Sequence, residues 1–152
     1  MTQYRNFHEG EAQLQAESGV DTARFDAMAE RAMQPELNQS EAMFVLQRTF
    51  SVAASIDTDG RPWASPLVGA MGELFSIHDA TTIRIASRRV EGDPLFDNIA
   101  ATGSMGVLFF NPSNRRRAKS LGQGQVEADG SITYRMTRLF GLCPKYLSLI
   151  HI

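Results

Sequence analysis

The chain has 152 residues, of which 43% are hydrophobic and 21% are charged, and its formal net charge is −2. These values are typical of a globular domain that is large enough to bury a core, and they exclude wholesale disorder. A nucleic-acid-binding protein is usually basic overall, so the composition does not favour a nucleic-acid partner.

The sequence shows no signal for membrane insertion or secretion. No apolar run approaches the roughly 20 residues that a helix needs to cross a bilayer, and Met1–Glu9 lack the apolar centre of a signal peptide. The single cysteine, Cys143, permits no internal disulfide and no cysteine-built metal site. His8, His78 and His151 have no partner at metal-ligand spacing. We therefore expect a soluble, cytoplasmic protein with no metal and no membrane partner.

The first 48 residues are predicted to form a helical segment that packs on the rest of the protein. Stretches rich in Ala, Glu, Gln and Met are interrupted by the breaking residues Gly19 and Pro35. Ser40 is placed to cap the last of these helices. The three helices expected are residues 9–17, 22–33 and 41–47.

From Thr49 onward the pattern changes to short apolar and β-branched stretches separated by turn residues. Asp59-Gly60 is predicted to form a two-residue hairpin turn with positive φ angles, and Asp129-Gly130 is a second turn signal. One helix, residues 93–101, interrupts the strands and carries Pro94 in its first turn, where the missing N–H costs nothing. Seven strands are expected near residues 49–56, 61–68, 73–77, 81–87, 104–110, 115–126 and 131–139.

Short antiparallel strands with one inserted helix favour a closed or partly closed barrel. The predicted class is therefore α+β but mainly β, with the barrel domain over residues 49–147. Residues 148–152 are largely apolar and have no helix stop. We expect them to be a truncated or non-native tail that contributes little to stability.

Residues 57–67 combine a turn with a strand of unusually small side chains. Strand alternation puts Ala64 and Pro66 on one face and Ser65 and Leu67 on the other. Small residues and a proline pack a sheet poorly, but they suit an edge strand or a strand whose backbone lies close to a flat ligand. An ordinary surface hairpin is the alternative interpretation.

Two basic clusters are candidates for an anion site. Ser87-Arg88-Arg89 ends a predicted strand, and a hydroxyl with two guanidinium groups can hold a phosphate through charge-assisted hydrogen bonds. In residues 115–119, alternation puts Arg115, Arg117 and Lys119 on one face, where like charges repel unless an anion or water separates them. A solvated edge strand explains this second cluster equally well. With a net charge near zero, a local site for a phosphate ester fits better than a groove for a polyanion.

Five short motifs occur in a fixed order along the chain. They are Phe7-His-Glu-Gly-Glu11, Asp59-Gly-Arg-Pro-Trp-Ala-Ser-Pro-Leu67, Gly92-Asp-Pro-Leu95, Asn114-Arg-Arg-Arg117 and Cys143-Pro-Lys-Tyr146. In this order and spacing the chain resembles the flavin-nucleotide-binding proteins related to pyridoxamine 5'-phosphate oxidase. The resemblance extends from residue 7 to residue 146.

The resemblance implies an FMN-binding split β-barrel, with N-terminal helices and one inserted helix, that forms a homodimer with FMN in clefts between the subunits. It implies an oxidoreductase that acts on a small-molecule substrate or electron donor. The strand after the Gly-Arg-Pro turn would lie along the flavin, the strand-end Ser-Arg-Arg would hold the phosphate, and Arg117 falls where the oxidase has a flavin-contacting glutamine. The cofactor-binding residues expected are Ala64, Ser65, Pro66, Leu67, Ser87, Arg88, Arg89, Arg117 and Lys119.

The chain departs from the oxidase in two respects. Counting from Gly60, it has Ser65 and Ala70 where the oxidase has a phosphate-binding arginine and lysine. Either Arg88, Arg89, Arg117 and Lys119 supply that charge, or the affinity for FMN is weak. It also lacks the oxidase's C-terminal motif for the substrate phosphate, so vitamin B6 oxidase activity is not expected. The alternatives are a non-catalytic flavin-binding, anion-binding or regulatory module, or a binder of a deazaflavin or of haem on the same fold. No catalytic residue can be named.

Overall fold

The computed structural model describes residues 9–142, which form two compact units divided between Gln34 and Pro35. The first unit contains, among its described residues, the helices α1 (Glu9–Glu17) and α2 (Thr22–Ala32). The helix α3, which was predicted to belong to the same N-terminal segment, belongs to the second unit. The predicted terminal segment, residues 148–152, lies outside the described range. No helix within that range has the length and apolarity needed to cross a membrane.

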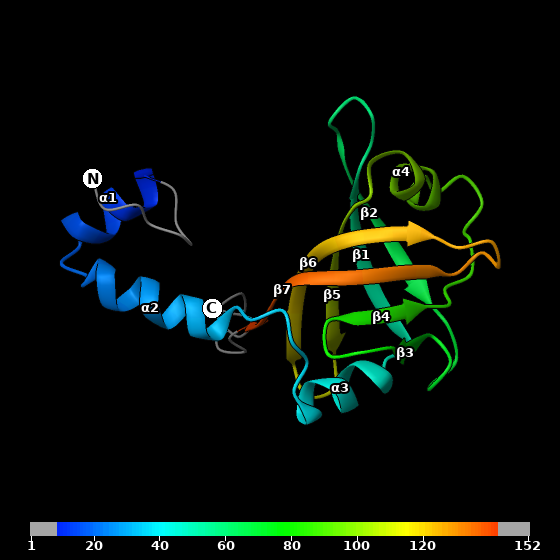
Figure 1. The fold of residues 1–152 in the computed structure, drawn as a ribbon, viewed down its shortest axis with the longest axis horizontal. Coiled ribbons are helices and arrows are strands. Elements are labelled where there is room, and N and C mark those ends of the chain that lie inside the picture. Colours follow the sequence, from blue (N-terminus) through cyan, green and yellow to red (C-terminus); the bar gives the residue numbers. More distant parts are fainter. Residues whose placement is uncertain (1–8, 143–152) are drawn as a thin grey trace. The chain divides into compact units, whose positions relative to one another are not determined.

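The second unit is built on one antiparallel sheet of seven strands that curls into a barrel (Figure 1). The strand order across the sheet is β2-β1-β5-β6-β7-β4-β3. Every strand predicted from the sequence is present, with ends shifted by at most three residues, and the predicted mainly-β class is confirmed. The strands are β1 (Phe50–Ile56), β2 (Pro62–Val68), β3 (Phe75–Ile77), β4 (Thr82–Ile85), β5 (Ser104–Asn111), β6 (Arg116–Val126) and β7 (Ile132–Leu142).

Alternate residues of the strands fill the interior of the barrel. Leu67, Ile83 and Tyr134 are fully buried there, from three different strands. Phe75 and Phe109 meet edge-to-face with their ring centroids 5.3 Å apart, a favoured geometry for aromatic pairs. The interior is therefore a packed core rather than a cavity for a ligand.

Two helices cover the barrel and add to its core. The helix α3 (Gln39–Leu46) buries Phe44 and Val45, and α4 (Leu95–Thr102) buries Leu95, Phe96 and Ile99. Both helices therefore derive their stability from burial against the sheet.

The starts of these helices differ from the prediction. Asn38, rather than Ser40, is the N-cap of α3, and it forms a reciprocal capping box with Glu41. Ser40 instead accepts a hydrogen bond from the Arg116 guanidinium at 3.1 Å. Pro94 is the N-cap of α4, so it precedes the first turn rather than lying within it.

The predicted Asp-Gly turns are present, but the loop at Asp59-Gly60 has three residues instead of two. The Asp57 N–H donates to the Arg61 carbonyl at 3.0 Å, and the Gly60 N–H donates to the Asp57 carbonyl at 3.0 Å. Gly60 has a φ of 80°, whereas Asp59 has no positive φ. This is a type I turn followed by a left-handed glycine, which needs only one residue with positive φ.

One irregularity bends the long β6–β7 hairpin. The register shifts between Leu121 and Gly122, so Thr137 has no residue opposite it while Gly122 pairs with Met136. Such a bulge increases the local twist of a strand pair. A Cβ atom at Gly122 would lie 2.1 Å from the carbonyl oxygen of Arg135. Only glycine permits this approach of the two backbones.

The buried hydroxyl of Tyr134 gives the stability a dependence on alkaline pH. It donates to Ser120 Oγ at 3.0 Å, and burial raises the pKa of Tyr134 to about 12. An unfolded tyrosine titrates near pH 10. The stabilisation from the raised pKa is therefore complete below about pH 10 and is lost as the pH rises toward 12.

We expect Tyr134→Phe to lower the free energy of unfolding by about 1 kcal/mol at pH 7, because one buried hydrogen bond is lost. The variant should also lose less stability than the parent protein above about pH 10. Urea unfolding at neutral pH and above pH 10 measures both effects. If the two proteins lose the same stability above about pH 10, groups other than Tyr134 cause that loss.

Candidate functional site

The open edge of β2 meets the segment that follows β4. The Val68 N–H donates to Ser87 Oγ at 3.0 Å, and the Arg88 N–H donates to the Val68 carbonyl at 3.5 Å. The Ser87 hydroxyl also donates to the Arg88 carbonyl at 3.4 Å. Two segments singled out in the sequence, the small-residue strand and Ser87-Arg88-Arg89, are therefore joined at one edge of the barrel.

The backbone of β2 alternates between its partner strand and the open edge. Because Val68 directs its N–H and carbonyl away from β1, the alternation directs the backbone groups of Ala64 and Pro66 the same way. Pro66 has no N–H to donate, but because its backbone faces the open edge, no hydrogen bond to β1 is lost. Since the Val68 N–H is already bonded to Ser87, Ala64 provides the N–H that remains among these three residues.

The side chains of the predicted β2 residues divide between two faces. Ala64 is exposed and Pro66 is half-buried on the outer face. Ser65 and Leu67 point into the barrel and are only 2% and 0% exposed. A ligand on the outer face can therefore contact the side chains of Ala64 and Pro66, but only the backbone of Ser65 and Leu67.

The two arginines after Ser87 lie in different surroundings, although both are exposed. The Arg89 guanidinium lies 4.3 Å from the centroid of the Phe96 ring in α4, and its Nη1 is 3.8 Å from the Asp97 carboxylate. The Arg88 guanidinium makes no ion pair or hydrogen bond within residues 9–142. Arg88 can therefore bind an anion without first giving up a partner.

Arg117 and Lys119 lie on the outer face of β6, with β1 and β5 between them and β2. At the usual spacing of about 4.8 Å between strands, this places them about 14 Å from the β2 edge. One phosphate cannot contact both basic clusters of the same chain. Arg115, predicted on the same face, lies in the preceding turn with a φ of 59°. Arg116 is held by α3, with its guanidinium 4.4 Å from the centroid of Phe44.

An apolar groove of about 660 Å³ runs over the outer face of β1, β5, β6 and β7 and reaches Pro62 at the start of β2. Val52, Ala54, Leu108 and Leu121 line it, and Lys119 is the only charged side chain among the described residues that do so. This groove was not predicted from the sequence. The signal available was that the outward positions of β1 and β5 are as apolar as the inward ones, a pattern typical of strands covered on both faces.

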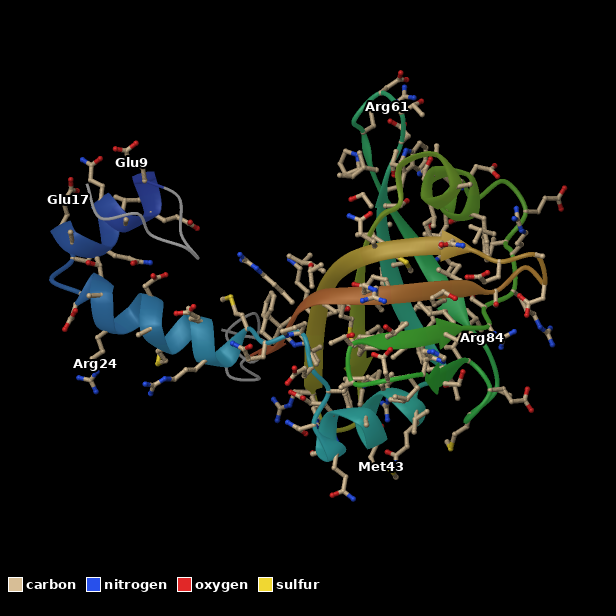
Figure 2. The ribbon with its side chains drawn as sticks, in the orientation of Figure 1. Glu9, Glu17, Arg24, Met43, Arg61 and Arg84 are labelled. Atoms are coloured by element: carbon tan, nitrogen blue, oxygen red, sulfur yellow. The ribbon has the colours of Figure 1, made fainter. Side chains whose placement is uncertain are left out.

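The β1–β2 hairpin projects beyond the barrel, with Arg61 near its tip (Figure 2). The Asp57 carboxylate accepts hydrogen bonds from Trp63 Nε1 at 3.1 Å and from Arg61 Nε at 2.8 Å. The bond from the Trp63 indole, with those from Arg61, holds the pKa of Asp57 well below its usual range. Asp57 was not among the predicted site residues, and its part is to fix the path of the chain into β2.

Comparison with known proteins places this architecture in a recognised fold. No protein-family model matches the chain, and a search of curated proteins finds no match either. Among solved structures, an FMN-binding protein from Syntrophomonas wolfei superposes with a TM-score of 0.55 at 9% identity, covering 84% of this chain and 97% of its own. A candidate pyridoxamine 5'-phosphate oxidase from Lactobacillus delbrueckii gives 0.55 at 10% identity, covering 70% and 95%. HupZ of Group A Streptococcus gives 0.55 at 17% identity, covering 70% and 94%.

At these identities the likeness is one of fold. The architecture is the split barrel that the resemblance to pyridoxamine 5'-phosphate oxidase-related proteins implied. Because the chain covers nearly the whole of each of these structures, the likeness includes the complete barrel.

Proposed function

We propose that this chain binds FMN and is a flavin-dependent oxidoreductase that acts on a small molecule. The observation that carries the proposal is the junction of β2 with Ser87 and Arg88, in a fold that FMN-binding proteins share. FMN has a phosphate at one end and a flat, polar-edged ring at the other. Arg88 and Arg89 would hold the phosphate, and the outer face of β2 would hold the ring.

The residues at this edge fit the chemistry of a flavin. Ala64 and Pro66 leave the β2 backbone accessible, so a flat ring can approach it closely. The Ala64 N–H and the carbonyl groups of Ala64 and Pro66 face the open edge, where they can bond the nitrogen and oxygen atoms of the ring. When bound, the flavin would carry the electrons, and the protein would bind and orient it.

FMN titration followed by flavin fluorescence tests the proposal, with riboflavin as a matched ligand that lacks the phosphate. We expect FMN to bind at least about tenfold more tightly than riboflavin, because charge-assisted contacts to the phosphate are lost in riboflavin. Mass spectrometry of any molecule released on denaturation would distinguish FMN from a deazaflavin or haem. Absence of binding by FMN, with no flavin in the purified protein, would refute the proposal.

The proposal also makes the protein a two-fold homodimer. A ring on β2 would be covered on one side only, and Phe50, Ile56 and Val68 beside it are 41–44% exposed. A second copy would bury these apolar side chains. It would also bring two basic residues toward the FMN bound on β2, namely Arg117 of the partner subunit and Lys119 of the partner subunit. Within one chain, Arg117 and Lys119 lie too far from β2 to reach that FMN.

We therefore expect a dimer by light scattering at micromolar concentration. Phe50→Glu and Val68→Glu should shift the protein toward monomer and weaken FMN binding, because a buried unpaired carboxylate opposes association. Glu73→Gln, a charge change on an exposed loop residue, is the control. A monomer that still binds FMN tightly would contradict the shared site.

A further inference from the structure

The two longest strands carry basic side chains and no acidic ones. Within β6 and β7 these are Arg116, Arg117, Lys119, Arg135 and Arg138. Lys119 and Arg138 share the outer face, since Leu121, the next outward residue after Lys119, pairs with Arg138. Diagonal neighbours of this kind have backbones about 7–8 Å apart, which long side chains span easily.

Lys119 leans from β6 toward β7. Its Nζ lies 5.9 Å from the centroid of the Phe140 ring on that strand. The bulged residue Thr137 lies next to Arg138, on the side away from Lys119, and its hydroxyl donates to the Leu121 carbonyl at 3.0 Å. Two basic residues therefore occupy diagonal positions on the same outer face, with no carboxylate on either strand to neutralise them.

One member of this basic pair, Lys119, lines the apolar groove together with Leu121 and Thr137, and the other described walls of the groove are mostly aliphatic. Arg138 adjoins the groove, because it pairs with Leu121 and follows Thr137 in the chain. A groove of this kind suits a ligand with an apolar body, and the basic pair suits an acid group at one end of it. The charge of Lys119 argues against a purely apolar occupant, because such a ligand would remove water from the ammonium group and supply no partner for it.

We propose that the groove binds an amphipathic anion, with its apolar body along Val52, Ala54 and Leu108 and its carboxylate, sulfonate or phosphate group on Lys119 and Arg138. That this molecule is the substrate of a flavin reaction rests on the proposed function, whereas the binding itself does not. The substrate class would then be apolar acids rather than neutral or cationic compounds.

The test uses two fluorescent probes with the same aromatic body. One is 8-anilinonaphthalene-1-sulfonate, and the other is N-phenyl-1-naphthylamine, which lacks the sulfonate. In the Lys119→Gln/Arg138→Gln variant we expect the affinity for the anionic probe to fall about tenfold or more, while the affinity for the neutral probe changes less than about twofold. Arg84→Gln is the matched control, because Arg84 is paired with Asp129 at 2.6 Å and lies on β4, a strand that contributes no residue to the groove.

A second variant tests the groove itself. Ala54→Phe places a ring on an exposed position of its wall and should weaken both probes. Near-ultraviolet circular dichroism confirms that each variant is folded. Equal losses for the two probes in the glutamine variant, or no loss for either, would overturn the proposal. The proposal would also be overturned if the parent protein is a dimer and binds neither probe, because the second subunit would then occupy the groove.

FMN titrations on the same proteins separate this inference from the proposed function. A parent protein that prefers the anionic probe but binds no FMN would refute the flavin function and leave the anion site standing. A protein that binds FMN but shows no preference for the anionic probe would refute the anion site alone.

Discussion

Replacing Gly122 with alanine is expected to destabilise the barrel severely. The new Cβ would lie 2.1 Å from the Arg135 carbonyl oxygen and 3.0 Å from Met136 Cα, so backbone atoms rather than a flexible side chain would have to move. Overpacking in a core usually costs about 1–3 kcal/mol. A clash between two paired strands should reach or exceed the upper end of that range.

Gly141→Ala is the matched control for this substitution. Gly141 lies on β7 of the same hairpin, and a Cβ there would have no atom within 4 Å. The control should leave the urea midpoint nearly unchanged, while Gly122→Ala lowers it strongly. Equal stability in the two variants would show that the bulge can relax at little cost.

Replacing Arg88 and Arg89 together with alanine is expected to weaken FMN binding strongly. Hydrogen bonds to charged groups contribute about 1.5–3 kcal/mol each, so the loss should exceed about tenfold. Arg88 should account for most of it, because Arg89 would have to leave its stacking on Phe96 to reach a phosphate. Titration of each single variant and of the double variant measures the two contributions.

Riboflavin provides the internal control for the arginine variants. If the arginines bind the phosphate, the double variant should bind riboflavin as the parent protein does, and its preference for FMN should disappear. Arg24→Ala/Arg31→Ala removes the same charge from the first unit and should leave FMN binding unchanged. Unaltered FMN affinity in the Arg88/Arg89 variant would remove these residues from the site.

The elements of the barrel were predictable because their signals are local. Period-two alternation and turn residues predict all seven strands, and even the faces of β2 were divided correctly. The errors concerned local features, such as helix caps, that depend on contacts with other segments of the chain. Asn38 caps α3 where Ser40 was expected, and the Ser40 hydroxyl instead accepts a hydrogen bond from Arg116, a residue far away in the sequence.

The candidate site was predictable only in part, because its assembly depends on contacts between distant segments. Alternation could not say which face of β2 is buried, so the predicted set combined outward Ala64 and Pro66 with inward Ser65 and Leu67. Two strands separate Arg117 from β2 in the sheet, and this strand order cannot be predicted from the spacing of motifs in the sequence. The junction of Val68 with Ser87 likewise joins residues that no local pattern relates.

The prolines of β2 also bear on how the protein behaves at high concentration. A free sheet edge is a template on which another chain can add a strand, and soluble proteins guard such edges. Pro62 and Pro66 occupy two of the β2 positions that face this edge, and the N–H of Val68, at a third, is already bonded to Ser87. An incoming strand would find one donor, at Ala64, where a regular ladder offers a row of them. The edge can thus remain open to a small ligand without becoming a starting point for aggregation.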